Sequence, residues 1–249
     1  MRAKLVGALL CVLALATAAP RAAQAQELEA ELTNHLVAIT TGFTGANVVL
    51  FGSTEEKGDV IVVVQGPTRD IVVRQKSKIA SIWVNTTQVT FRSVPSFYSI
   101  SSSRPLNEIA PARMLEAKQI SLEGLRLVPD GDLAPDEAQE FRTALIRSQE
   151  RTGLYLASAE PVKFEGDHLF HTTIAFPANV PTGDFLVQVF LLRNSALVKA
   201  QTLTLTVSQV GFDARVHDFA DHDALAYGII AVALAALAGW LASLPFRNA

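Results

Sequence analysis

The feature that most constrains this chain is an uncharged apolar run near its C-terminus. Residues 224–244 (ALAYGIIAVALAALAGWLASL) contain no Asp, Glu, Lys or Arg. As a helix, 21 residues extend about 31 Å, which matches the roughly 30 Å hydrocarbon core of a bilayer. Tyr227 and Trp240 fall near the two ends of the run, where aromatic rings prefer the membrane interface. The run therefore predicts a transmembrane helix at 224–244, followed by a short tail at 245–249.

A second apolar run, at the N-terminus, has the pattern of a secretory signal peptide. A short positive segment, Met1–Lys4, precedes the uninterrupted apolar stretch Leu5–Ala19, and Ala23–Ala25 supplies the small residues of a signal-peptidase site. We expect residues 1–25 to be removed; an uncleaved anchor is the alternative, but the stretch is short for a bilayer. The single cysteine, Cys11, lies in this segment, so the mature chain would contain no disulfide or thiolate site.

Both runs predict the same orientation in the membrane. Arg247 follows the C-terminal run, and positive charge marks the cytoplasmic side of a span. We therefore expect a single-pass protein of the bacterial inner membrane, with an N-terminal body in the periplasm and the C-terminus in the cytoplasm. The net charge of −3 and the lack of a Lys/Arg-rich run argue against nucleic-acid binding.

The body between the two runs has the pattern of a β-sandwich. Short segments rich in Val, Ile and aromatic residues recur between turn residues, among them Val48–Phe51, Val60–Val64, Ile71–Val73, Ile82–Val84, Val89–Phe91 and Phe97–Ile100, with a turn at Asn85–Thr87. The run Val60–Val64 does not alternate, as expected for a strand covered on both faces. We expect one or two immunoglobulin-like antiparallel β-sandwich modules. The cysteine–tryptophan–cysteine core of true immunoglobulin domains is absent, so the prediction concerns architecture only.

A helical segment interrupts the β pattern. Pro135–Arg151 begins with a proline and two acidic residues, which favour a helix N-terminus, and Gly153 follows its end. The β pattern then returns at Val162–Phe164, Leu169–Phe176, Phe185–Leu192 and Leu197–Val207, with Asn194-Ser195 as a hairpin tip. The sequence thus divides into a β-sandwich module at 26–104, a helical insertion at 105–152, a second β-rich module at 153–212 and a juxtamembrane segment at 213–223.

Several segments of the chain together resemble a known family. They include Asn34–Gly45, Leu50–Gly52, Gly58–Gly66, Ile82–Asn85, Val94–Tyr98, Ser102–Leu106, Gly153–Tyr155 and Gly239–Ala242. These segments resemble the "putative transmembrane protein" family of Alphaproteobacteria, a family without an assigned activity. Its members are often encoded beside a sulfite-exporter-like permease, so the resemblance implies an integral membrane partner, such as a permease.

Catalytic motifs are absent from the sequence. It contains no G-x-S-x-G, no G-x-x-x-x-G-K-[ST], no H-E-x-x-H and no C-x-x-C. No side chain that could act as a nucleophile stands at a recognisable spacing from a base. We therefore expect a protein that is not an enzyme and uses no cofactor.

Two groups of residues are candidate binding sites. Trp83, Tyr98 and Arg104 are residue types that dominate protein–protein contacts, and the alternative is that the aromatic residues belong to the core. In a helix, His217 and Asp221 would lie one turn apart beside His222, which could hold a divalent metal. The alternative for this group is a solvated polar cap before the transmembrane run.

These observations favour a membrane-anchored periplasmic interaction or accessory module that is not an enzyme and that partners an integral membrane protein. The alternative is a periplasmic accessory subunit that binds a metal or a small ligand. Ligand-dependent stabilisation of the body would distinguish the second function from the first.

Overall fold

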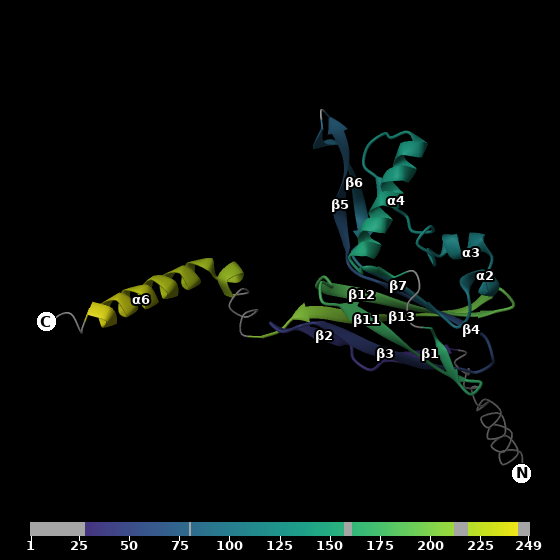
Figure 1. The fold of residues 1–249 in the computed structure, drawn as a ribbon. Helices are drawn as coiled ribbons and strands as arrows, with labels where there is room; N and C mark the ends of the chain where they lie inside the picture. The colour runs from purple at the N-terminus through teal and green to yellow at the C-terminus, as the bar shows by residue number, and fades with distance from the viewer. Residues whose placement is uncertain (1–27, 80, 157–160, 212–218, 244–249) are drawn as a thin grey trace, which may run out of the picture.

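A computed structural model of the chain describes residues 28–79, 81–156, 161–211 and 219–243. The predicted signal peptide, 1–25, and the predicted tail, 245–249, lie outside these ranges and stay predictions. Within the described ranges the protein is mainly β, with three sheets and a long C-terminal helix (Figure 1).

The body of the molecule is a sandwich of two sheets. The first sheet has the strand order β1-β3-β11-β10, with β1 (Leu28–Leu32), β3 (Gly45–Thr54), β10 (Lys163–Glu165) and β11 (Leu169–Pro177). The second has the order β2-β13-β12-β4-β7-β9, with β2 (Leu36–Ile39), β4 (Asp59–Gln65), β7 (Tyr98–Ser102), β9 (Tyr155–Leu156), β12 (Gly183–Arg193) and β13 (Ala196–Gln209). Neighbours pair antiparallel, except for two short parallel pairs, β2 with β13 and β7 with β9.

The two β-rich regions of the sequence contribute to both sheets. In the first sheet β3 pairs with β11, and in the second β4 pairs with β12, so each half of the chain completes the other. In the lettering of an immunoglobulin sandwich, β1, β3, β11 and β10 correspond to strands A, B, E and D, and β13, β12 and β4 correspond to strands G, F and C. The two sheets thus have the immunoglobulin strand orders ABED and GFC. Strands from both predicted β regions, 26–104 and 153–212, therefore build one sandwich together.

The core explains why these segments form strands. Val60–Val64 is buried at every position, as its unbroken apolar run predicted, and lies between β12 and β7 in the middle of the second sheet. Strand β11 instead alternates buried and exposed residues, because only one face of the first sheet is covered. Phe176 from the first sheet meets Phe185 from the second at a ring distance of 5.5 Å, and Phe97 contacts both rings. These rings join the two sheets into one core.

A third sheet projects from the sandwich (Figure 1). It contains the hairpin β5 (Thr68–Ile79) and β6 (Ile82–Pro95), with the short strand β8 (Val128–Pro129) beside β6. Helix α4 (Pro135–Arg151) lies along β5, burying Phe141 and Leu145. We call β5, β6, β8 and α4 the hairpin lobe. Two short helices, α2 (Leu106–Ile109) and α3 (Ala112–Ala117), follow β7.

The hairpin corrects one detail of the sequence prediction. The two strands predicted at Ile82–Val84 and Val89–Phe91 are one unbroken strand, β6, and the turn predicted at Asn85–Thr87 is wrong. The chain reverses instead beside Ser81, whose φ of 69° is of the left-handed kind found in tight turns. Polar residues can occupy a strand when one of its faces is exposed to solvent, so composition alone placed the turn incorrectly.

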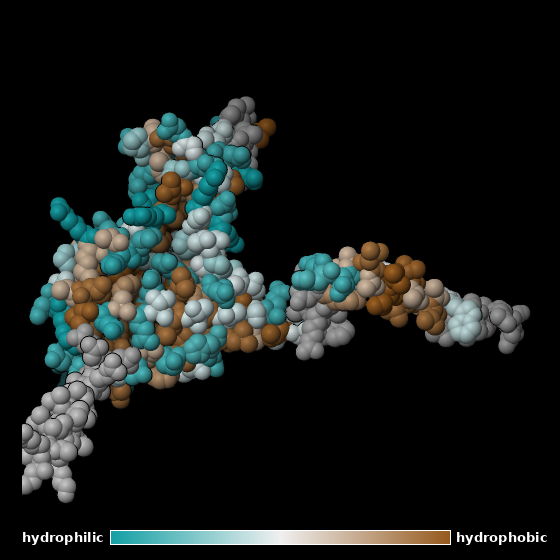
Figure 2. Space-filling view, turned by 180° about the vertical axis from the view of Figure 1, so that it is seen from behind, coloured by the Kyte–Doolittle hydropathy of each residue, from teal (hydrophilic) through white to brown (hydrophobic). Residues whose placement is uncertain are grey.

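Helix α6 (Ala224–Ser243) occupies the segment predicted to be helical at the C-terminus. Its described side chains, up to Trp240, are exposed, and Figure 2 shows a hydrophobic surface along most of the helix. Among the residues that the structure describes, no helix meets the combined requirements of length and apolarity for a membrane span.

The two ends of the sandwich differ in what lies there. At one end, the exit end, β13 finishes at Gln209 and the chain continues toward α6. The hairpin lobe joins the sandwich at the same end. Pro67, directly before β5, packs against Gly183, the first residue of β12, so closely that a Cβ on Gly183 would lie 2.8 Å from the Pro67 ring. At the opposite end, the pocket end, β12 turns into β13 at Asn194–Ser195 and β3 turns into β4. Strand β13 separates the two ends by roughly 45 Å, at about 3.3 Å for each residue.

Candidate functional site

A pocket of about 750 Å³ opens at the pocket end of the sandwich. Its walls come from the β3–β4, β10–β11 and β12–β13 turns, together with the β7–α2 connection and the end of α2. They include Glu56, Gly58, Asp59, Arg104, Glu108, Ile109, Phe164, Asp167 and Arg193. Small-molecule sites commonly have volumes of roughly 300–1,000 Å³. The turns at one end of an immunoglobulin sandwich are also where binding residues gather in variable domains.

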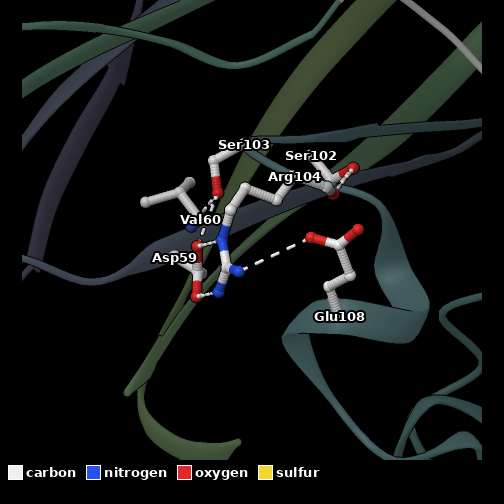
Figure 3. A network of polar contacts seen from close by, with 6 residues as sticks. All are labelled: Asp59, Val60, Ser102, Ser103, Arg104 and Glu108. Atoms are coloured by element: carbon white, nitrogen blue, oxygen red, sulfur yellow. Dashed lines mark hydrogen bonds and ion pairs between the residues drawn. The ribbon is translucent and has the colours of Figure 1, made fainter. Parts of the chain in front are cut away.

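One wall of the pocket is a network of polar contacts around Asp59 and Arg104 (Figure 3). Nε of Arg104 donates to Oδ1 of Asp59 over 2.8 Å, and Nη2 donates to Oδ2 over 2.6 Å. Ser103 Oγ donates to the same carboxylate over 3.2 Å and accepts the Val60 backbone N–H. Glu108, from α2, lies 3.7 Å from the remaining Arg104 nitrogen, Nη1. The guanidinium of Arg104 is thus clamped between two carboxylates.

The clamp changes the acid–base properties of both partners. The hydrogen bonds from Arg104 lower the pKa of Asp59 below the ordinary aspartate value, although partial burial opposes the shift. The same hydrogen bonds from Arg104 to Asp59 raise the pKa of Arg104. Both shifts favour the charged form of the side chain at neutral pH.

Arg193, on the opposite wall, is held quite differently. It is the last residue of β12, and its side chain is only 20% exposed. Nη1 lies 3.1 Å from Oε2 of Glu56, but Nε and Nη2 are buried without a hydrogen-bond acceptor. Gly58 makes room for the stem, since a Cβ there would lie 3.2 Å from Arg193 Cγ and closer still to Leu192 O. A permanently charged group is thus packed into the pocket wall with two unused donors.

The rim of the pocket is charged and open to solvent. Lys57 lies 3.4 Å from Asp167, and both side chains are exposed to more than two thirds. Three cationic side chains (Lys57, Arg104 and Arg193) thus face four carboxylates (Glu56, Asp59, Glu108 and Asp167) around the pocket. The buried Ile109 and the partly buried Phe164 add apolar surface. The arrangement suits the recognition of a charged solute.

The structure separates the three residues predicted for partner binding. Arg104 lines the pocket. Tyr98 is fully buried: its ring packs on Tyr155 at 5.9 Å and its hydroxyl donates to Gln119 O over 2.5 Å. Trp83 lies near the tip of the hairpin lobe, where its backbone pairs with Lys78. Tyr98 therefore belongs to the core, which was the alternative for the aromatic residues, whereas Arg104 lines the pocket.

The residues predicted as metal ligands are only partly within the described ranges. His217 lies outside them, whereas Asp221 and His222 fall in a helical turn, residues 219–222, just before α6. Among the described residues, no group of three His, Cys, Asp or Glu side chains converges as a metal site would require. The metal hypothesis therefore stays a prediction.

Most charged residues of the pocket were not predicted from the sequence, among them Asp59 and Arg193. Asp59 is 45 positions from Arg104, and nothing in the sequence pairs them. Arg193 carried a signal that could have been used: it is a charged residue at the end of the apolar strand Phe185–Leu192, directly before a predicted turn. A charged side chain between an apolar strand and a turn lies at the edge of the hydrophobic core, where binding sites commonly form.

The fold and the terminal helix define a mainly β protein with an immunoglobulin-like strand order and a long apolar helix at its C-terminus. The sequence model of the family described as "Putative transmembrane protein" (Alph_Pro_TM) matches residues 27–248, so the chain belongs to this family. The match confirms the resemblance predicted from the sequence. No curated protein matches the chain.

Proposed function

We propose that this protein is a membrane-anchored accessory module of the bacterial inner membrane, with its body in the periplasm and an integral membrane protein as its partner. The observation that carries the proposal is the position of the hairpin lobe. The lobe is rooted at the end of the sandwich from which the chain leaves for α6. An anchored α6 would therefore hold the lobe close to the membrane and the pocket roughly 45 Å farther away.

The anchor in this proposal is the uncharged run 224–244. A helix over this run is about 31 Å long, enough to cross the hydrocarbon core. By helical spacing, exposed apolar side chains of α6 lie on opposite faces, with Leu225 and Ile229 on one face and Ile230 and Leu234 on the other. A helix that is apolar all round is typical of a segment surrounded by lipid or by other protein. The family name supports a membrane setting.

The contact surface in this proposal is the hairpin lobe. Three apolar side chains on it are well exposed: Val72, Ile82 and Val128, with Ile82 at 68% near the tip. Arg74 and Lys78 are exposed on β5, so the surface combines apolar and basic groups. Such a surface fits a partner that offers apolar groups flanked by acidic ones. The proposed partner beside α6 is an integral membrane protein with such a surface, for example a permease.

Site-specific photo-crosslinking in intact cells tests the proposal. A photoreactive amino acid at position 82 should form an adduct with one membrane protein, whereas the same group at position 194, at the pocket end, should not. Ile82→Glu should abolish co-purification of that partner, while the control Leu169→Glu, on the exposed face of the sandwich, should not. Absence of a protein adduct at position 82, or adducts with lipid alone, would contradict the proposal.

A small-ligand accessory subunit is the second candidate function, and the pocket favours it. The pocket lies at the end of the sandwich away from α6, so binding there would leave the hairpin lobe free for a partner. The two functions are compatible within one molecule.

A further inference from the structure

The outer face of the first sheet has an exposed apolar pair near its pocket end. Phe51 on β3 and Leu169 on β11 are 46% and 58% exposed. Leu169 lies opposite Ser53, two positions from Phe51, so the two apolar side chains are diagonal neighbours on one face. They line a hollow of about 610 Å³ together with Glu29, Ser53 and Glu165. Apolar surface rimmed by polar residues is a common feature of interaction sites.

Carboxylates stand at both ends of one row of residues on this face. Across the four strands, from β1 to β10, the row reads Glu29, Ser53, Leu169 and Glu165. Neighbouring strands are about 4.8 Å apart, so the two ends of the row are separated by roughly 14 Å. Glu29 and Glu165 are both exposed, and within the described ranges neither is in an ion pair.

The next row of the sheet has a different charge pattern. In the same strand order it reads Glu31, Phe51, His171 and Lys163. The Glu31 carboxylate accepts the Leu32 backbone N–H over 3.0 Å and lies 2.9 Å from Nε2 of His35. One end of this row is thus already engaged, and the other end is a lysine. The row from Glu29 to Glu165 is therefore the one that offers a carboxylate at each end.

The edge of β1 beside this face is closed to a further strand. Gln201, on β13, accepts the Ala30 N–H with Oε1 and donates from Nε2 to Ala30 O, both over 2.9 Å. The side-chain amide thus makes the two hydrogen bonds that the backbone of a neighbouring strand would make. A partner segment at this place has the face of the sheet available to it, not the backbone of Ala30.

We propose that this face binds an extended basic segment of a partner protein, with two cationic residues on Glu29 and Glu165 and an apolar residue between them on Phe51 and Leu169. In an extended segment, residues i and i+4 point to the same side and are about 13 Å apart, close to the separation of the two carboxylate positions. Residue i+2, midway, points to the same side and meets the apolar pair. Charge and spacing together thus select a segment with a cation, an apolar residue and a cation at alternate positions.

The hairpin lobe leaves this face free. Its strands β5 and β6 follow β4 and precede β7, both of the second sheet, and Figure 1 shows the lobe on the side of the sandwich opposite β3. Binding on the first sheet is thus separate from the contact with a membrane partner proposed above. Its failure would leave that proposal intact.

Titration calorimetry on the full-length protein in non-ionic detergent, at low ionic strength, tests the proposal with the peptide Lys-Thr-Leu-Thr-Lys, blocked at both ends. The wild type should bind this peptide saturably, and it should not bind Glu-Thr-Leu-Thr-Glu. The double variant Glu29→Gln with Glu165→Gln should weaken binding by about tenfold. The matched control, Glu137→Gln with Glu150→Gln, removes two exposed carboxylates of α4 and should change the Kd by less than about twofold.

Two single variants distinguish this site from a surface that is merely acidic. Leu169→Ser should weaken binding of the peptide by about threefold or more, because apolar contact is lost, and should leave binding of spermidine unchanged. Lys163→Gln removes the lysine of the next row and should tighten binding of the peptide by about twofold, a gain that misfolding cannot produce.

Three results would overturn the proposal. One is equal binding of the peptide by the wild type and the double variant at Glu29 and Glu165, or an equal loss in the α4 control. Another is spermidine binding as tight as that of the peptide in both the wild type and Leu169→Ser. The third is no saturable binding of the peptide to the wild type and to Lys163→Gln.

Discussion

The two ends of the sandwich are built from different chemistry. At the exit end the sheets are joined by three buried aromatic rings that contact one another, Phe97, Phe176 and Phe185. At the pocket end they are closed by ion pairs, most of them exposed, around a hollow. Burial of an aromatic ring contributes several kcal/mol, whereas an exposed ion pair contributes roughly 0–1 kcal/mol. The exit end therefore contributes more to the stability of the fold, whereas contacts at the pocket end can be exchanged at little cost in free energy.

The largest expected effect is at the exit end. Phe176→Ala removes a ring that contacts both Phe97 and Phe185, so it should lower the free energy of unfolding by about 3–5 kcal/mol. Because both β regions share the sheets, the whole body should unfold in one transition at lower denaturant concentration. Chemical denaturation followed by far-ultraviolet circular dichroism, which reports on the strands, measures it. Two separate transitions would contradict the single sandwich.

Tyr98 provides a sharper test of the same end. Tyr98→Phe keeps the buried ring and removes the hydroxyl that donates to Gln119 O, so it should cost about 1–2 kcal/mol. The same measurement applies, with Tyr98→Ala expected to cost more because a cavity is added. Unchanged stability in both variants, together with loss of the partner, would instead make Tyr98 a contact residue.

The Asp59–Arg104 clamp should respond to pH. Because the pKa of Asp59 is lowered in the folded state, its contribution to stability is complete above the ordinary aspartate value, about 3.9, and is lost as pH falls through the folded pKa. At pH 7, Arg104→Ala should lower the free energy of unfolding by less than Tyr98→Phe does, because the Arg104 side chain is half exposed. The difference between the variant and the wild type should shrink below about pH 4. A difference that is constant from pH 7 to pH 3 would show that the clamp is not the cause.

The smallest effect is expected at the rim of the pocket. Lys57→Ala removes an exposed pair with Asp167 and should leave the free energy of unfolding within about 0.5 kcal/mol of the wild type. Added salt should reduce even this difference. A loss of stability as large as that of Tyr98→Phe would contradict the proposed difference between the two ends.

Local signals in the sequence located several elements of the fold. The proline and acidic residues that open Pro135–Arg151 predicted α4, and the chain has that helix with the same bounds. Asn194 and Ser195 were predicted as a hairpin tip, and both have positive φ, as a tight β-hairpin turn requires. Such features depend on a few neighbouring residues, so the sequence contains all the information that they need.

Features that depend on distant residues were not predictable in the same way. Strand β2 was missed because it pairs in parallel with the far end of β13, about 170 positions along the chain. Arg104 was identified as a candidate, but its partner Asp59 was not, and the unused donors of Arg193 emerge only when three turns meet. Tyr98 was read as either core or contact, and only burial distinguishes these.

The central claim is that α6 anchors the protein with the body outside the cytoplasmic membrane. The only native cysteine is Cys11, so single-cysteine variants can be made in a Cys11→Ser background. In spheroplasts, a maleimide that cannot cross the membrane should label Asn194→Cys at once and Asn248→Cys only after permeabilisation. Immediate labelling of both positions, or of position 248 alone, would contradict the account.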